Sequence, residues 1–434
     1  MSWAFGIQDF SSLKEFICRD GITLEHALVH PQLRVAFKRQ FTPLIKFLLA
    51  NLCKLFDVAM MDMTDDNKMI ISNAIYCLST PAVSFTNHLP SHRDFLQKLS
   101  DFLQSPDFNL TRATTFSIIF DSAISFTTGY ILVTFPNKDT LTQRMMAHIK
   151  MPPIYNSISN LLVSLYSPII KFLADNNVMQ NIFDSLGEDD EVNSLIFDLF
   201  IECSKSNIAI ISPIATTENI QKIHEHVFTS SSHEVGSKGI ILIMDICNCM
   251  KSTRNTNANF KESIDLLISK VDDMCDYIKS GDDYTIVKSH VADLIIYLIP
   301  HIRSFTQPLK DLPIHFFNIL FQYPLNSIEH HQFIVLFKLL LNQIKPEDMK
   351  QITDRIPIAF DQYRKINATY WYHLFQVTQL IKHTHKEPKN DEKWNKYVST
   401  MFADLTERSK QGYGGRLPQV QEPSDYYDYE EEDM

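Results

Sequence analysis

Glycine is scarce in this chain, with 10 residues out of 434, whereas an average protein has about 7%. Proteins that bind nucleotides or phosphates use glycine in tight loops, where the backbone approaches the ligand closely. Three of the ten glycines, Gly412, Gly414 and Gly415, lie near the C-terminus. The remaining seven leave little material for such loops, so the composition argues against a nucleotide-binding enzyme.

One segment superficially resembles a phosphate-binding P-loop. VGSKGIIL, residues 235–242, contains two glycines and a lysine but lacks the Gly-Lys-Ser/Thr group that the P-loop requires. We expect Gly236 and Gly239 to allow close packing between helices instead.

Basic residues are outnumbered: 40 Lys and Arg face 51 Asp and Glu, giving a net charge of −11. Residues 409–434 hold seven acids and two bases, so they carry −5 and the body carries the remaining −6. No basic stripe with interleaved aromatic residues is present, and we expect no binding to nucleic acid.

The C-terminal segment 409–434 is polar, acidic and rich in tyrosine, and it is predicted to be a disordered tail. Its tyrosines Tyr426, Tyr427 and Tyr429 lie among acidic residues. Two readings remain open: a modification or docking element, and a tail that only keeps the protein soluble.

The chain has neither a disulfide framework nor an apparent signal peptide. Its seven cysteines are odd in number and mostly lie within apolar helical runs, which predicts reduced, buried thiols. The start, MSWAFGIQDF, has no basic region followed by an apolar one. We therefore expect a cytoplasmic protein, with the nucleus as a second location.

Only one segment, residues 114–135, has the length of a membrane span with few charges. Asp121 lies well inside it, where a charge costs about 2.5–3.5 kcal/mol on insertion scales. Gly129 weakens it further as a single helix. The prediction is a buried helix followed by a second short element, with no membrane insertion.

Helical patterns fill the rest of the chain, and the 19 prolines are spread along it. Only two segments are strand candidates, 130–135 and 207–214. A succession of roughly eighteen short helices predicts an all-α fold, an armadillo/HEAT-like α-solenoid over residues 1–408. That fold is a right-handed superhelix of helical repeats, and since no motif recurs cleanly here, the repeats are degenerate.

Residues 42–63 illustrate the pattern. Thr42 is the predicted N-cap and Pro43 the first helical residue of one long helix. Polar residues occupy a narrow stripe and the remainder is apolar, as expected for an inner helix covered on more than one side.

Two adjacent histidines, His330 and His331, enter an apolar helix after the turn YPLN. Neighbouring residues of a helix diverge by about 100°, so the two rings cannot easily bind one ion. His331 shares its face with Lys338 and Asn342, whereas His330 shares its face with apolar residues. We predict that His331 faces solvent and that His330 is buried with a hydrogen-bond partner, either Asn326 or a carbonyl of the turn. Of these two we expect an Asn326–His330 hydrogen bond, which would hold the turn on the next helix. A ligand or catalytic role for His330 is the alternative.

Other chemical candidates are weaker. KIHEHVFTSSSHE, residues 222–234, gathers His224, His226 and His233, but the first two are spaced i, i+2 and not the i, i+4 of zinc-binding helices. Cys247 and Cys249 have the same i, i+2 spacing and no second pair, which favours buried core thiols. We predict no catalytic residue, no metal site and no cofactor.

The turn carries a resemblance to a known family. SAPS-domain proteins, the regulatory subunits of protein phosphatase 6 and its fungal counterpart, have a Y-P-W-N-N-x-x-H-like segment ahead of an apolar helix. Four residues here match that segment: Tyr323, Pro324, Asn326 and His330. Leu325 and Ser327 replace its Trp and second Asn, so a contact made by that indole is not carried over.

Other segments are similar to the family in the same order, over most of residues 1–408. They are an aromatic start with Trp3 and Phe5, TLEHAL (23–28), LIKFL (44–48), SNAIYCLSTPAVSFTNHL (72–89), the segment 172–206 and a helix at Trp394.

The resemblance implies a non-catalytic regulatory or scaffold subunit. Its partner would be the catalytic subunit of a type-2A-like Ser/Thr phosphatase of the phosphatase 6 type, together with an ankyrin-repeat subunit. Two alternatives remain: another α-solenoid adaptor, for protein transport or trafficking, and a metal-dependent enzyme that uses the histidines of residues 222–234.

Overall fold

The computed structural model describes residues 10–206, 208–252, 257–281, 283–366, 370–388 and 391–410. Every regular element within these ranges is a helix, and none of the described residues is in a strand. The all-α prediction is therefore confirmed. Both strand candidates are helical: α10 (Tyr130–Thr134) and the 3₁₀ helix η2 (Ile208–Ile214). The predicted tail lies outside the described residues from 411 onward.

The chain divides into two compact units, residues 1–269 with 285–290, and residues 270–284 with 291–434. The first unit contains α1 (Ser11–Ile17), α2 (Leu24–Leu28), α3 (Leu33–Lys38), α4 (Thr42–Ala50), α5 (Leu52–Ala59), α6 (Lys68–Ser79), α7 (Val83–Thr86), η1 (Leu89–Ser91), α8 (Arg93–Phe102), α9 (Leu110–Phe126), α10, α11 (Lys138–Met146), α12 (Pro152–Leu162), α13 (Ser167–Asp175), α14 (Val178–Phe183), α15 (Asp190–Ser206), η2, α16 (Thr217–Thr229), α17 (His233–Ser252) and α18 (Asn257–Ser269).

Helix α20 (Ile286–Leu298) begins in the first unit and ends in the second. The second unit further contains α19 (Val271–Lys279), η3 (Ile299–His301), α21 (Gln307–Lys310), α22 (Leu312–Gln322), α23 (Ser327–Leu340), η4 (Leu341–Gln343), α24 (Pro346–Ile366), α25 (Trp371–His383), α26 (Glu392–Tyr397), the π-helical η5 (Val398–Phe402) and α27 (Ala403–Lys410).

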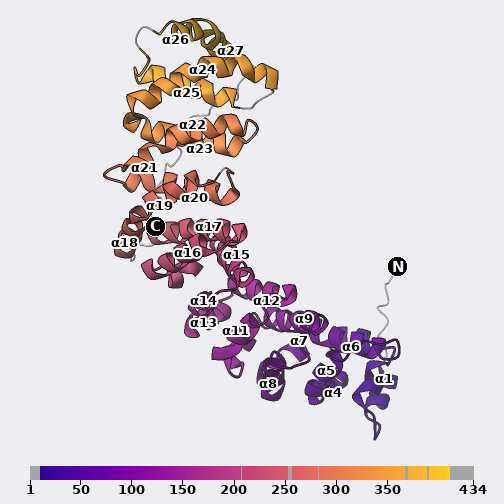
Figure 1. The fold of residues 1–434 in the computed structure, drawn as a ribbon. Coiled ribbons are helices and arrows are strands. Elements are labelled where there is room, and N and C mark those ends of the chain that lie inside the picture. Colours follow the sequence, from indigo (N-terminus) through magenta and orange to yellow (C-terminus); the bar gives the residue numbers. More distant parts are fainter. Residues whose placement is uncertain are drawn as a thin grey trace, which may run out of the picture. The chain divides into compact units, whose positions relative to one another are not determined.

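Within each unit, helices pack on near neighbours in the chain (Figure 1). In the first unit, α6, α9, α12, α15 and α17 form a row in which each helix contacts the next. In the second unit, α22 packs on α23, α23 on α25, and α24 on both α22 and α25. This stepwise packing, with short connections, is a solenoid-like architecture.

Many side-chain hydrogen bonds between successive helical layers have sequence separations of 39 to 46 residues. Others lie outside this range, such as Lys279 to the Pro308 carbonyl at 29 and Tyr284 to Gln332 at 48. Examples are Asn73 to the Leu28 carbonyl, Arg144 to Ser100, Ser159 to Glu202, Thr217 to Ser263, and Gln332 to Asp293. Because each layer uses different residue types, this spacing of about forty residues leaves no recurring motif in the sequence.

The predicted single helix 42–63 is wrong, since α4 and α5 are separated at Asn51. The Asn51 amide donates a 2.9 Å hydrogen bond to the Phe47 carbonyl, an alternative to regular helical bonding that asparagine commonly provides. Thr42 is the first helical residue, after Phe41, with Pro43 second. The sequence also predicts two helices, 347–353 and 358–366, and this prediction is wrong: α24 continues through Pro357, with Ile352 and Phe360 buried on either side.

The apolar segment 114–135 forms two elements as predicted, the C-terminal part of α9 and the short helix α10. Gly129 joins them with φ = +83°, and a Cβ atom there would lie 2.3 Å from the Ile169 side chain. Taken one at a time, none of the described helices is long and apolar enough to cross a membrane, although two bent helix pairs meet the length and composition criteria.

The two glycines of α17 pack closely against other helices, as predicted. A Cβ atom at Gly236 would lie 2.9 Å from the Val287 side chain, and one at Gly239 would lie 2.4 Å from Val227. Both distances are shorter than real Cβ contacts allow, so these positions explain two of the few glycines without any phosphate-binding role.

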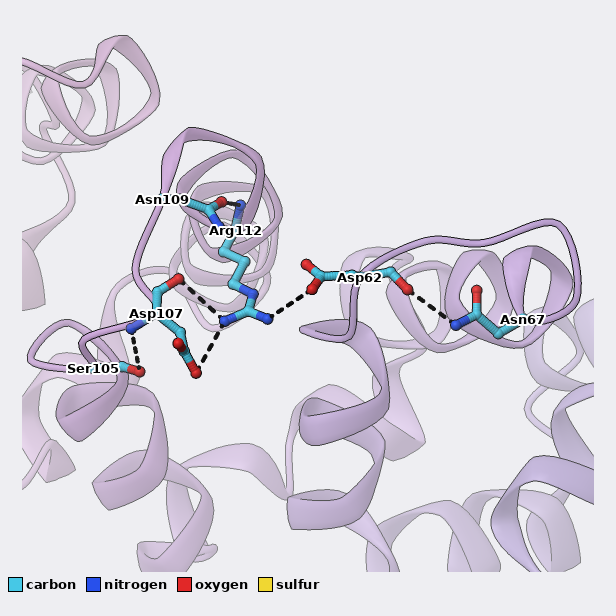
Figure 2. A network of polar contacts seen from close by, with 6 residues as sticks. All are labelled: Asp62, Asn67, Ser105, Asp107, Asn109 and Arg112. Carbon is cyan, nitrogen blue, oxygen red and sulfur yellow. Dashed lines mark hydrogen bonds and ion pairs between the residues drawn. The ribbon is translucent and has the colours of Figure 1, made fainter.

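Polar side chains fix two loops of the first unit near α9 (Figure 2). Asn109 caps this helix, and Arg112 in its first turn lies 3.3 Å from an Asp62 carboxylate oxygen and 3.4 Å from an Asp107 one. Asn67 in turn donates to the Asp62 carbonyl. The arrangement connects the loop before α6 to the loop before α9 and is structural.

Candidate interaction site at the YPLN turn

The four residues of the turn end one helix and start the next. Tyr323 has a non-helical backbone (φ −118°, ψ 67°), because the proline after it disfavours the helical conformation, and so α22 ends at Gln322. The Asn326 backbone N–H donates to the Tyr323 carbonyl across the turn. The Asn326 side chain then caps α23 by accepting a 3.2 Å hydrogen bond from the Glu329 N–H.

His330 is fully buried and His331 is exposed, as predicted. The His330 Nε2 atom donates to the Tyr323 carbonyl oxygen at 3.0 Å. The predicted Asn326–His330 side-chain hydrogen bond is therefore wrong. The turn carbonyl, which was the other partner considered, accepts the bond from His330, because the Asn326 side chain caps α23 instead. Burial lowers the pKa of His330 to about 4, against the opposing effect of the hydrogen bond to Tyr323.

Glu329, which the sequence reasoning missed, is also fully buried, and neither carboxyl oxygen has a hydrogen-bond partner. Burial raises its pKa to about 9, so the carboxyl group is protonated at neutral pH. Its Oε2 atom lies 3.6 Å from His330 Nε2, beyond a good hydrogen bond. The spacing Asn326-x-x-Glu329 resembles a capping box, which would have predicted an exposed glutamate reaching back to the cap.

Aromatic side chains of α25 and the residue before it cover the buried pair. The His373 ring centroid lies 5.3 Å from that of His330, and the Tyr370 ring centroid lies 6.1 Å away. Tyr370 itself is buried and contacts Phe321 at 5.3 Å. These contacts close the site from the side of α25.

A chain of hydrogen bonds anchors the turn from the other side. The Tyr323 hydroxyl accepts from the Tyr284 backbone N–H at 3.2 Å. The Tyr284 hydroxyl donates to Gln332, whose amide donates to Asp293 at 2.7 Å. Tyr323 therefore fixes the turn through both its carbonyl and its hydroxyl group.

Two large apolar side chains of this turn are exposed. Leu325 is 68% exposed and Ile328 is 58% exposed, whereas Glu329 and His330, which follow in the sequence, are buried. Large aliphatic side chains in water contribute little to folding, so two of them on a turn held by several hydrogen bonds suit contact with another protein.

The buried pair is poorly arranged for acid–base catalysis or metal binding. Both side chains are neutral at pH 7 and closed off from solvent, so neither can exchange a proton with an outside substrate. Among the residues that the structure describes, no three His, Cys, Asp or Glu side chains are grouped so that they could hold a metal ion.

The other candidate residues are dispersed. His224 and His226 lie on α16 and are partly exposed, whereas His233 is the exposed first residue of α17. Cys247 and Cys249 are buried in α17, and burial raises the pKa of the Cys247 thiol to about 12. Five of the seven free cysteines are buried as predicted, but Cys18 is exposed and Cys53 partly so.

No family model, no curated protein and no solved structure matches this chain in the comparisons made.

Proposed function

We propose that the chain is a non-catalytic regulatory or scaffold subunit. It binds the catalytic subunit of a type-2A-like Ser/Thr protein phosphatase of the phosphatase 6 type and directs it to substrates. The proposal rests on the ordered resemblance to SAPS-domain proteins. The main structural observation in its support is the YPLN segment, in which Leu325 and Ile328 are exposed and the following His330 is buried and bonded to the turn.

We further propose that the helices form an armadillo/HEAT-like right-handed superhelix. The side-chain bonds between layers, 39 to 46 residues apart, support this because repeats of that class are about 40–47 residues long. A stack of such repeats offers an extended surface to a compact partner at a low ordering cost.

The same proposal includes an ankyrin-repeat protein as a second partner and the cytoplasm, or also the nucleus, as the location. The alternative of a solenoid adaptor for transport or trafficking uses the same surface and differs only in the partner. The metal-dependent enzyme has less support, because His224, His226 and His233 lie on two helices with no common ligand geometry in the described residues.

Affinity capture of the tagged chain from its own cells, analysed by mass spectrometry, tests the proposal. We expect a near-stoichiometric phosphatase catalytic subunit, lost in the double variant Leu325→Ser, Ile328→Ser. Leu339→Ser is the matched control, since Leu339 is 40% exposed on the same helix α23. Capture without any phosphatase subunit at low salt would overturn the proposed partner.

Capture of the phosphatase that is equally strong in the double variant and the control would place the contact elsewhere. The scaffold function would then stand, and the role given to the YPLN turn would be wrong.

A further inference from the structure

The connection between α5 and α6 exposes methionine side chains. Met61, Met63 and Met69 are 51%, 53% and 55% exposed. Of the other methionines within the described ranges, seven are buried and three are partly buried. The fully exposed thioethers of the described chain therefore gather in one segment, residues 61–69, which is called the methionine loop below.

Backbone and polar side-chain bonds fix the conformation of the methionine loop. The Asn67 side chain accepts a 2.6 Å hydrogen bond from the Thr64 N–H and donates a 3.0 Å bond to the Asp62 carbonyl. The Lys68 N–H donates to the Thr64 carbonyl at 2.9 Å. Figure 2 shows the Asp62 carboxylate facing Arg112 of α9, 3.3 Å away. None of these bonds involves a thioether, so the loop keeps its conformation when the chemistry of its methionines changes.

A thioether is oxidised by two electrons to a sulfoxide. With hydrogen peroxide, a sulfur lone pair attacks one oxygen atom and the O–O bond breaks. The proton of the sulfur-bound oxygen then passes to the departing hydroxide, which leaves as water. Sulfur is oxidised and peroxide is reduced. Because hydrogen peroxide is neutral, the exposed acids Asp62, Asp65 and Asp66 do not repel it.

Met60 provides a contrast within the same stretch of chain. It directly precedes Met61 and is only 6% exposed. A buried thioether meets peroxide only when its surroundings open, whereas an exposed one reacts in the folded state. A sulfoxide in the core also disrupts packing, because it is polar. At Met61, Met63 and Met69 the new oxygen is hydrated instead, and the fold is retained.

We propose that Met61, Met63 and Met69 form a reversible oxidation site. Hydrogen peroxide converts them to sulfoxides without unfolding the chain, and a methionine sulfoxide reductase converts them back. In the return step two thiol groups become a disulfide, the S–O bond breaks, and the oxygen leaves as water. Oxidation replaces the apolar thioethers by polar groups among acidic residues. It therefore changes the contacts that the loop can make with other molecules.

Peroxide treatment of the full chain, followed by peptide mapping, tests the selectivity. We expect Met61, Met63 and Met69 to be oxidised about tenfold faster than Met60, or more. Met60 and Met61 occur in one tryptic peptide, between Lys54 and Lys68, so fragment ions compare them in the same sample. Oxidation of Met60 at the rate of Met61 would overturn the proposal.

Urea denaturation before and after this treatment tests whether the fold is retained. We expect the same midpoint for the oxidised and the untreated chain. The triple variant Met61→Leu, Met63→Leu, Met69→Leu lacks the site, whereas the control Met60→Leu retains it, and leucine is close to methionine in volume. A midpoint that falls on oxidation of the wild type and of Met60→Leu, but not of the triple variant, would contradict a fold-neutral site.

The chain recovered from its own cells tests the reversibility. After mild peroxide exposure we expect sulfoxide at the three positions, and its loss once the peroxide is removed. Purified reductases for the two sulfoxide epimers should return the oxidised chain to its original mass. Sulfoxides that these enzymes leave unchanged would overturn the proposal. So would thioethers that are oxidised in the purified chain but not in cells, since another molecule would then cover them.

Discussion

The YPLN turn and the start of α13 depart from the usual distribution of side chains in opposite ways. The turn buries a carboxyl group and an imidazole, whereas Tyr166, just before α13, and Ile170 within it are exposed. At the turn, neutral protonation states and a carbonyl partner for His330 reduce the free-energy cost of burial. Among the described residues, Tyr166 and Ile170 keep about half of their surface in water, so they contribute less to folding than core side chains do.

The largest expected effect is on folding at the turn. His330→Ala removes a buried ring and one of the two hydrogen bonds to the Tyr323 carbonyl, so the free energy of unfolding should fall by about 2–3 kcal/mol. Urea denaturation followed by circular dichroism measures this. His331→Ala is the control and should change the stability by less than about 0.5 kcal/mol, because His331 is exposed. A loss below about 1 kcal/mol for His330→Ala would contradict the structural role.

The second effect is a pH dependence of the free energy of unfolding, which arises from the raised pKa of the buried Glu329 carboxyl group. The folded protein keeps the Glu329 proton up to about pH 9, whereas the unfolded chain releases it near 4.5. The unfolded state therefore binds fewer protons between these values, and stability contributed by this group falls as pH rises.

His330 has the opposite sign over a different range. Its pKa drops from 6.5 to about 4 on folding, so it lowers stability as pH falls below 6.5. The two slopes offset each other between about pH 4.5 and 6.5, and above 6.5 only that of Glu329 remains. We expect the free energy of unfolding to decrease from pH 6.5 to 9, by up to about 1.4 kcal/mol per pH unit.

Glu329→Gln tests this assignment, because glutamine has nearly the same shape and no titrating proton. The decrease above pH 6.5 should disappear in the variant. Between about pH 4.5 and 6.5 the slope of His330 should become visible, because Glu329 no longer offsets it. The same alkaline slope in variant and wild type would show that another group is responsible.

The smallest effect is expected at α13, and it sharpens the contrast. Ile170→Ser should change the free energy of unfolding of the monomer by no more than about 0.5 kcal/mol, because nearly half of the side chain is already exposed. Urea denaturation followed by circular dichroism gives the value. A loss of about 2 kcal/mol or more would mean that Ile170 contributes to stability as a core position does.

The sequence predicted much of the helical structure and of the burial of individual helical residues. The 100° step between neighbouring residues was enough to place His330 inside and His331 outside, and Gly236 and Gly239 were correctly read as packing positions. It failed where a side chain competes with the backbone, as at Asn51, and where packing overrides a breaker, as at Pro357.

The candidate sites were only partly visible. The turn was found through its motif, but Glu329 follows a capping pattern that usually means exposure, and only the packing of α25 against α23 buries it. On α13, Lys171 and Asp175 mark the exposed side in the sequence, but the exposure of Ile170 beside them could not be predicted. It depends on which helices pack against α13 after folding.

Local chemistry along the chain determined the helices, their caps and the absence of glycine-rich loops, because periodicity, proline and capping residues act within a few positions. The tertiary structure decided which polar groups lose water and which apolar ones keep it. It also decided the spacing of about forty residues between bonded layers. Burial is a property of neighbours that the chain brings together only on folding, and both the neutral Glu329–His330 pair and the exposure of Ile170 on α13 follow from it.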